Sequence, residues 1–74
     1  MAADVSKCRF FPTAHLLDRM RERGITTSEV DEAVYRGSRV WTDGDKKFQA
    51  IAGSCVVVVA FRKCHLTGVT TWVA

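Results

Sequence analysis

The segment Ile25-Thr26-Thr27-Ser28-Glu29-Val30 holds the most specific structural signal in the chain. Thr26 and Glu29 have the Thr-x-x-Glu spacing of a capping box, in which each side chain bonds to the backbone N–H of the other residue. Ile25 and Val30 flank this box at the positions of a hydrophobic staple. The segment therefore predicts that a helix begins at a fixed corner in the chain.

Two helices are expected, one on each side of this corner. Residues 13–23 carry leucine and methionine side chains at helical spacing, and Gly24 stands at the C-cap position. The helix that follows the capping box should run to about residue 36, where Gly37 closes it. Ahead of both helices, residues 7–11 alternate polar and apolar side chains, which predicts a short strand.

After the helices, the hydrophobic period changes to two, which is typical of strands. Residues 38–43 and 46–51 flank Gly44-Asp45, a dipeptide that suits a type II′ hairpin and would pair Trp41 with Phe48. A type I′ turn that starts one residue earlier gives an alternative register.

The remaining strands complete the predicted fold. Residues 55–61 are a continuous run rich in β-branched side chains, which predicts a central strand covered on both faces, and residues 69–73 form the last strand. The order of elements predicts an α+β fold in a single domain over residues 1–74. In it, a short N-terminal strand and a helical hairpin precede a four-stranded, mostly antiparallel sheet.

Composition and charge narrow the classes of protein. The chain has 74 residues, of which 47% are hydrophobic and 26% charged, as in globular domains. No apolar run approaches the roughly 20 residues of a membrane helix, and the N-terminus has no signal-peptide core. We therefore expect a cytoplasmic protein with no membrane contact. The net charge is +3, with the excess in residues 38–74, which favours nucleic acid or an acidic protein as partner.

The cysteines predict neither a disulfide framework nor a metal site. Cys8, Cys55 and Cys64 cannot all pair within one chain, and no Cys-x-x-Cys spacing typical of zinc is present. The sequence also has no phosphate loop and no dinucleotide-binding fingerprint. We therefore expect three reduced thiols, no metal and no cofactor.

The segment from Phe11 to Val30 contains His15, Arg19-Met20 and Arg23-Gly24-Ile25. This arrangement resembles the His-x-x-x-Arg-Met-x-x-Arg-Gly-Ile pattern of a family of small prokaryotic proteins of unknown function. The order of elements is in turn similar to the RelE/ParE-like toxin superfamily. That resemblance implies RNA cleavage, binding to RNA or the ribosome, and an antitoxin-like protein as partner.

One candidate site follows the predicted central strand, where Arg62, Lys63 and His65 cluster. RNA cleavage by transesterification needs a proton-transfer group and positive charge at the phosphate. His65 and Arg62 are the predicted catalytic residues, and Arg39 and Lys63 are predicted to contact the phosphates. Period-two geometry would place Arg62 and Lys63 on opposite faces of the sheet. An ordinary solvated turn is the alternative interpretation.

A second candidate site is a stripe on the first helix. His15, Arg19 and Arg23 recur every four residues, so they are neighbours on the helix surface and could bind a phosphate. Alternatively, the arginines pair with acidic neighbours on the same helix, and His15 forms a hydrogen bond at the strand–helix corner.

Lys46 and Lys47 complete the predicted nucleic-acid-binding residues. Trp41, Phe48 and Trp72 are expected first to pack on a face of the sheet. Alternatively, an exposed aromatic side chain beside these lysines and Arg39 would resemble a base-stacking surface. The leading hypothesis is a RelE/ParE-like protein that binds RNA or the translation machinery, with endoribonuclease activity of the toxin type. The rival hypothesis is a module without catalysis that pairs with itself or with another protein.

Overall fold

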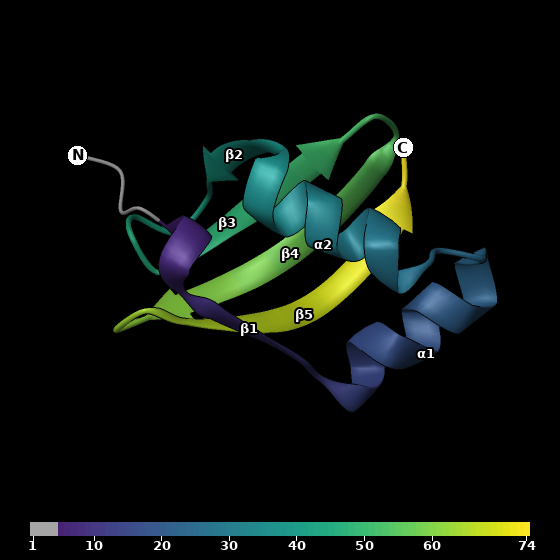
Figure 1. The fold of residues 1–74 in the computed structure, drawn as a ribbon, viewed down its shortest axis with the longest axis horizontal. Coiled ribbons are helices and arrows are strands. Elements are labelled where there is room, and N and C mark those ends of the chain that lie inside the picture. Colours follow the sequence, from purple (N-terminus) through teal and green to yellow (C-terminus); the bar gives the residue numbers. More distant parts are fainter. Residues whose placement is uncertain (1–4) are drawn as a thin grey trace.

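The computed structural model describes residues 5–74 and confirms the expected α+β class (Figure 1). Helices and strands follow one another in the predicted order. They are the 3-10 helix η1 (Val5–Lys7), β1 (Arg9–Pro12), α1 (Ala14–Arg23), α2 (Thr27–Arg36), β2 (Ser38–Trp41), β3 (Lys47–Ala52), β4 (Cys55–Arg62) and β5 (His65–Val73). Within these residues, no helix is long and apolar enough to cross a membrane.

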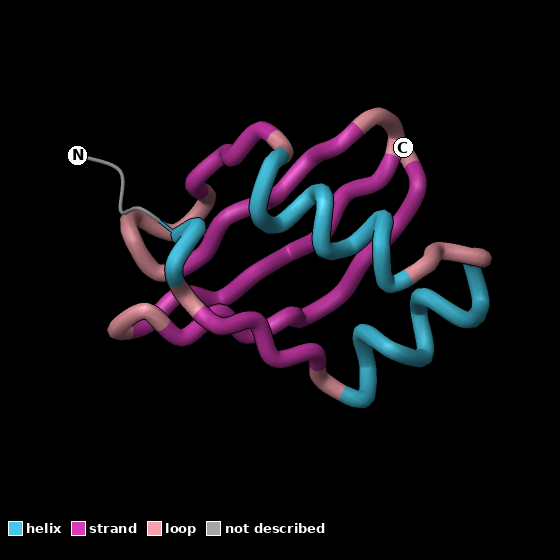
Figure 2. Tube along the Cα trace, viewed as in Figure 1, coloured by secondary structure: helices cyan, strands magenta, loops and turns pink. Residues whose placement is uncertain are grey.

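The strands form one five-stranded mixed sheet in the order β1-β5-β4-β3-β2 (Figure 2). The strands β2 to β5 are joined as consecutive antiparallel neighbours, as expected. The N-terminal strand β1 adds a fifth member, because it pairs in parallel with β5. Arg9 lies opposite His65 at the start of this parallel pair, although the two residues are far apart in the sequence.

The helix–helix corner has the predicted chemistry. The backbone N–H of Glu29 donates to the Thr26 hydroxyl at 3.2 Å, and the backbone N–H of Thr26 donates to the Glu29 carboxylate at 3.0 Å. Gly24 ends α1 in the left-handed region at φ 67°, and the N–H of Ile25 donates to the Met20 carbonyl at 2.9 Å. Contacts between residues close in the sequence therefore end α1 and start α2 at this corner.

Two tight turns bring the ends of four strands together. Trp41 pairs with Phe48, and Gly44 has a φ of 57° at the first central position of its turn, which agrees with the predicted type II′ register. The second turn consists of Lys63 and Cys64, which both have left-handed backbones. Lys63 therefore lies in a turn and not in a strand, so the period-two argument for its orientation was wrong.

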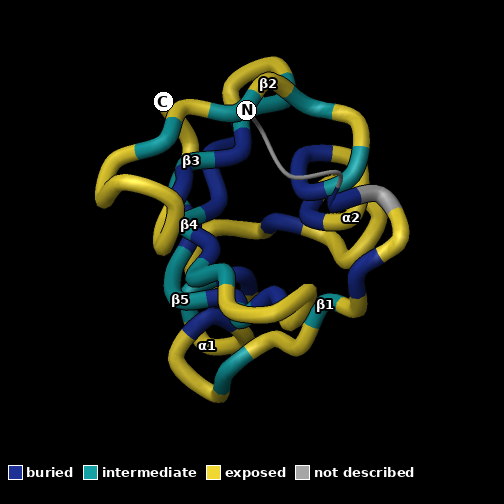
Figure 3. Tube along the Cα trace, turned by 90° about the vertical axis from the view of Figure 1, so that its left-hand side faces the viewer, coloured by how far each residue is buried: buried dark blue, intermediate teal, exposed yellow. Residues whose placement is uncertain are grey.

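The helices cover one face of the sheet and leave the other uncovered. Phe48, Val57 and Leu66 on the covered face are fully buried and belong to one core with residues of both helices. Figure 3 shows buried stretches in the central strands and in α2. Gly68 lies beneath α1, where a Cβ atom would stand 2.5 Å from the Leu16 side chain. On the second face, no helix of residues 5–74 packs against β4. The expectation that both faces of this strand are covered holds in part, because Val56 on the second face is only 5% exposed although no helix lies over it. We call the second face the open face.

Candidate nucleic-acid interface

Three strands bring Arg9, His65 and Arg62 into one row on the open face. Arg9 on β1 is the registered partner of His65 on β5, and His65 is also the registered partner of Arg62 on β4. Registered partners project from the same face of a sheet, and all three residues are exposed. The row therefore has one arginine on each side of His65.

An aromatic ring lies directly beside this row. Phe11 follows Arg9 by two residues on β1, so it projects from the same face. Its ring stacks on the imidazole of His65, with 4.3 Å between ring centroids and 11° between ring planes. Phe11 is 41% exposed, so the stack offers aromatic surface to solvent.

Lysines extend the positive charge across the sheet. Lys47 on β3 is the registered partner of Ala60, which lies two residues before Arg62 and therefore on the same face. The carbonyl of Lys46 accepts the N–H of Phe61 at 2.7 Å, so this turn residue lies at the same end of the sheet. We call this set the basic end, and its members are Arg9, Lys46, Lys47, Arg62, Lys63 and His65.

The structure places Arg39 on the covered face, away from the basic end. Arg39 is the registered partner of the buried Ala50, and its guanidinium donates to the carbonyls of Val34 and Tyr35 at 3.3 and 3.4 Å. These carbonyls belong to the last turn of α2, where a positive charge is favourable. The geometry therefore gives Arg39 a structural contact where the sequence suggested a phosphate contact.

The aromatic residues expected beside the lysines also face the helices. Phe48 is fully buried, and Trp41 packs on it with ring centroids 4.9 Å apart. Trp72, in contrast, is half-buried on the open face as the registered partner of Val56. Aromatic surface on the open face thus comes from Phe11 and Trp72.

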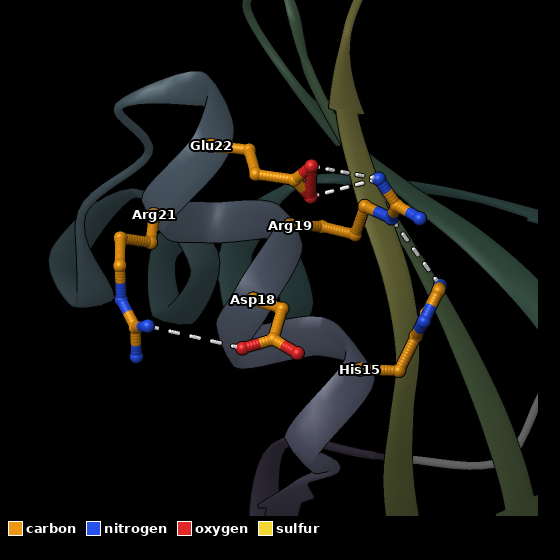
Figure 4. A network of polar contacts seen from close by, with 5 residues as sticks. All are labelled: His15, Asp18, Arg19, Arg21 and Glu22. Atoms are coloured by element: carbon orange, nitrogen blue, oxygen red, sulfur yellow. Dashed lines mark hydrogen bonds and ion pairs between the residues drawn. The ribbon is translucent and has the colours of Figure 1, made fainter.

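The stripe on α1 is separate from the basic end. Arg19 donates to both carboxylate oxygens of Glu22, at 2.8 and 3.1 Å, and its Nε lies 3.5 Å from the imidazole of His15 (Figure 4). Arg19 therefore pairs with an acidic neighbour on its own helix, which was the alternative to phosphate binding. Arg23 is exposed at the C-terminal end of α1. Because α1 begins after the far end of β1, the structure does not bring this stripe to His65.

No protein-family model, curated protein or solved structure matches the chain. The resemblance to RelE/ParE-like toxins therefore remains a prediction.

Two cysteines differ from expectation. Cys8 and Cys64 form a disulfide, and Cys55 is a free, buried cysteine. The expectation of three reduced thiols was wrong, because the parallel pairing of β1 with β5 brings positions 8 and 64 together. Burial raises the pKa of the Cys55 thiol above its ordinary value of 9.0, a shift that a contact with Thr71 opposes and the charge of Glu29 reinforces.

Sequence reasoning missed Arg9 and Phe11 as site residues. Both lie on the short strand that was expected from residues 7–11, and their alternation was visible. Their proximity to His65, however, depends on a strand pairing between distant parts of the chain. No local signal in the sequence identifies β5 as the neighbour of β1.

Proposed function

We propose that this protein binds single-stranded RNA at the basic end of the open face. The observation that carries the proposal is the stack of Phe11 on His65 between the guanidinium groups of Arg9 and Arg62. Exposed rings stack on unpaired bases, and arginine guanidinium groups form paired hydrogen bonds to phosphate oxygens. The row and the Phe11 ring beside it therefore offer both kinds of contact to a bound nucleotide.

The distribution of charge supports this orientation of the RNA. The helices lie over the opposite side of the sheet, and α2 carries Glu29, Asp31 and Glu32 against a single basic residue, Arg36. On α1, Asp18 and Glu22 are offset by Arg19, Arg21 and Arg23, so the negative excess lies on α2. Near the basic end, Asp43 and Asp45 lie in the turn between β2 and β3 and offset part of its charge. An RNA backbone is therefore attracted to the open face and repelled by α2.

Endoribonuclease activity is the finer form of this proposal. His65 would move the proton of the 2′-hydroxyl or of the leaving oxygen, and Arg62 would stabilise the pentavalent phosphate. Lys63 lies next to this pair in the turn and supplies a further cation. RNA binding needs the positive charges and the aromatic surface, whereas cleavage also needs a proton-transfer group. Binding is therefore the main proposal, and cleavage extends it.

A second candidate function, self-association, is favoured by the other end of the open face. Trp72 and Ile51, which are half-buried, lie on either side of the buried Val56 in one registered row, and the half-buried Val58 lies in the next row. Val40, on the edge strand β2, is 50% exposed. Apolar surface of this kind suits pairing with a second copy of the chain or with another protein.

Binding of a fluorescein-labelled single-stranded RNA, measured by anisotropy over a series of salt concentrations, tests the proposal. We expect affinity to fall with salt, and Arg62→Ala to weaken binding and reduce the salt slope by about 0.7. Arg21→Ala is the matched control, because Arg21 is an exposed arginine on α1 whose ion pair with Asp18 is long, at 3.9 Å.

Two outcomes would contradict RNA binding at this site. Either the parent protein does not bind the RNA at low salt, or Arg21→Ala weakens binding as much as Arg62→Ala does. Sedimentation of the parent protein over a range of concentrations examines the second candidate. Association that high salt does not weaken would favour pairing through the apolar part of the open face.

A further inference from the structure

The Cys8–Cys64 disulfide lies at the start of β1 and β5, two of the strands that contribute to the basic end. Cys8 comes directly before β1, and Cys64 comes directly before β5. Their Cα atoms are 4.8 Å apart, next to the registered pair of Arg9 and His65. The covalent bond therefore anchors the two strands on which Phe11 and His65 stack.

The two ends of this disulfide differ in exposure. Cys8 is 5% exposed, its N–H donates to the carbonyl of Val5 at 3.0 Å, and its carbonyl accepts the hydroxyl of Tyr35 at 3.0 Å. Cys64, in contrast, is exposed in the turn between β4 and β5. An incoming thiolate therefore reaches the bond from the side of Cys64.

The surroundings of Cys64 favour thiol–disulfide exchange. Lys63 precedes it in the sequence, and a positive charge there favours the approach of an incoming thiolate and the later release of Cys64. Lys63 and Cys64 also have φ values of 48° and 60°, which residues other than glycine adopt only when neighbouring structure holds them there. The disulfide is one of the contacts that hold this turn.

We propose that Cys8 and Cys64 form a reversible redox pair that controls the basic end, an inference whose functional consequence rests on the proposed RNA binding. The reductant is a dithiol of the thioredoxin class. One of its thiolates attacks Sγ of Cys64, forms a mixed disulfide and releases Cys8, which takes up a proton. Its second thiol then attacks the mixed disulfide and releases Cys64 as a thiol. The protein disulfide gains two electrons and two protons, and the dithiol becomes a disulfide.

Reduction loosens the strand that carries Arg9 and Phe11. Without the disulfide, β1 is held to the sheet by four registered pairs and at its far end by Thr13, whose N–H and hydroxyl donate to the Gly68 carbonyl at 3.1 and 2.7 Å. At its near end, the hydroxyl of Tyr35 still donates to the Cys8 carbonyl. A short parallel edge strand of this kind opens more readily than the central strands. The oxidised protein therefore holds the Phe11–His65 stack in place and binds RNA more tightly than the reduced protein.

Titration of the parent protein with reduced and oxidised dithiothreitol tests this pair without reference to RNA. Alkylation and mass spectrometry after denaturation should show one free thiol in the oxidised protein, that of Cys55, and three in the reduced protein. Amide hydrogen exchange in β1 should become faster on reduction, while exchange in β3 stays unchanged. RNA affinity should fall by about tenfold, as expected for the loss of one base-stacking contact.

Two variants sharpen the experiment. Cys64→Ser should behave like the reduced protein in every buffer, whereas Cys55→Ser should keep the full redox response. If Cys64→Ser does not fold, the dithiothreitol titration of the parent protein decides alone.

The outcomes separate this inference from the proposed function. If β1 exchanges equally in both redox forms, or if reduction unfolds all strands together, the disulfide is a static support and the redox proposal is wrong. If β1 responds to reduction but neither form binds RNA, the proposed function is wrong and the redox pair stands.

Discussion

The ring of Phe11 lies nearly parallel to the imidazole of His65, with 4.3 Å between their centroids. The two residues stand 54 positions apart in the sequence (65 − 11), and only the parallel pairing of β1 with β5 brings them into contact. An imidazole held against a ring has a fixed orientation on the open face. This contact makes His65 part of a defined surface, whereas a solvated turn was the alternative that its sequence context left open.

Replacement of Phe11 should weaken RNA binding more than it weakens the fold. Phe11→Ala removes the stacking surface, which is worth about 1–3 kcal/mol per base in other single-strand-binding proteins. Because Phe11 is 41% exposed, its loss leaves no closed cavity in the core. Anisotropy titrations and thermal melting of the same preparations measure the two effects. Phe11→Tyr serves as the control and should retain affinity, and equal affinities for Phe11→Ala and Phe11→Tyr would contradict a stacking role.

Arg39 should matter for stability and not for RNA binding. Arg39→Met keeps most of the apolar stem but loses the donors to the Val34 and Tyr35 carbonyls, so we expect a loss of about 1–2 kcal/mol in the free energy of unfolding. Arg62→Met, on the open face, should change stability by less than about 0.5 kcal/mol. Urea denaturation compares the two variants. If a folded Arg39→Met variant binds RNA more weakly than the parent protein, Arg39 contributes to RNA binding and the prediction is wrong.

The parts of the fold that follow from short-range chemistry were predictable. The capping box at Thr26 and the register of Trp41 with Phe48 each depend on residues close together in the sequence. The orientation of Arg39 was predictable from the same register. Arg39 lies two residues before Trp41, so both project from one face of the strand, and Trp41 packs on the buried Phe48.

The parts that join distant segments were not predictable. The pairing of β1 with β5 joins segments on either side of the helical hairpin, and no local pattern in the sequence predicts it. The Cys8–Cys64 disulfide, Arg9 and Phe11 all depend on it. Sequence reasoning therefore found the β4–β5 side of the basic end and missed the β1 side.

The helix–helix corner should be sensitive to two single substitutions for different reasons. Thr26→Ala removes the acceptor for the Glu29 N–H and should lower the free energy of unfolding by about 1 kcal/mol. Gly24→Val should lower it further: a Cβ there meets no atom within 4 Å, but φ is 67° and a β-branched residue is disfavoured in that conformation. Urea denaturation measures both changes. A Gly24→Val variant as stable as the parent protein would show that this cap conformation is not required.

The buried thiol of Cys55 should make the protein less stable in alkaline solution. Its pKa is raised in the folded protein, chiefly by burial, so the folded state keeps the proton where the unfolded chain loses it. The unfolded chain then binds fewer protons, and the free energy of unfolding falls as pH rises above about 9. Denaturation of the parent protein and Cys55→Ala at pH 8 and above measures this slope. The slope should be shallower in Cys55→Ala, and identical slopes would show that Cys55 does not contribute.

The two histidines provide a test of where any RNA cleavage occurs. If the parent protein cleaves RNA, His65→Ala should reduce the rate by roughly 10² to 10⁴, as expected for loss of a proton-transfer group, while RNA binding persists. His15→Ala is the matched control, because His15 is exposed on α1 and contacts Arg19 away from the basic end. Gel assays of a labelled RNA, with enzyme in excess, give the rates for each variant. Loss of cleavage in His15→Ala with full activity in His65→Ala would move the reaction to the helical stripe and leave the Phe11–His65 stack a binding contact alone.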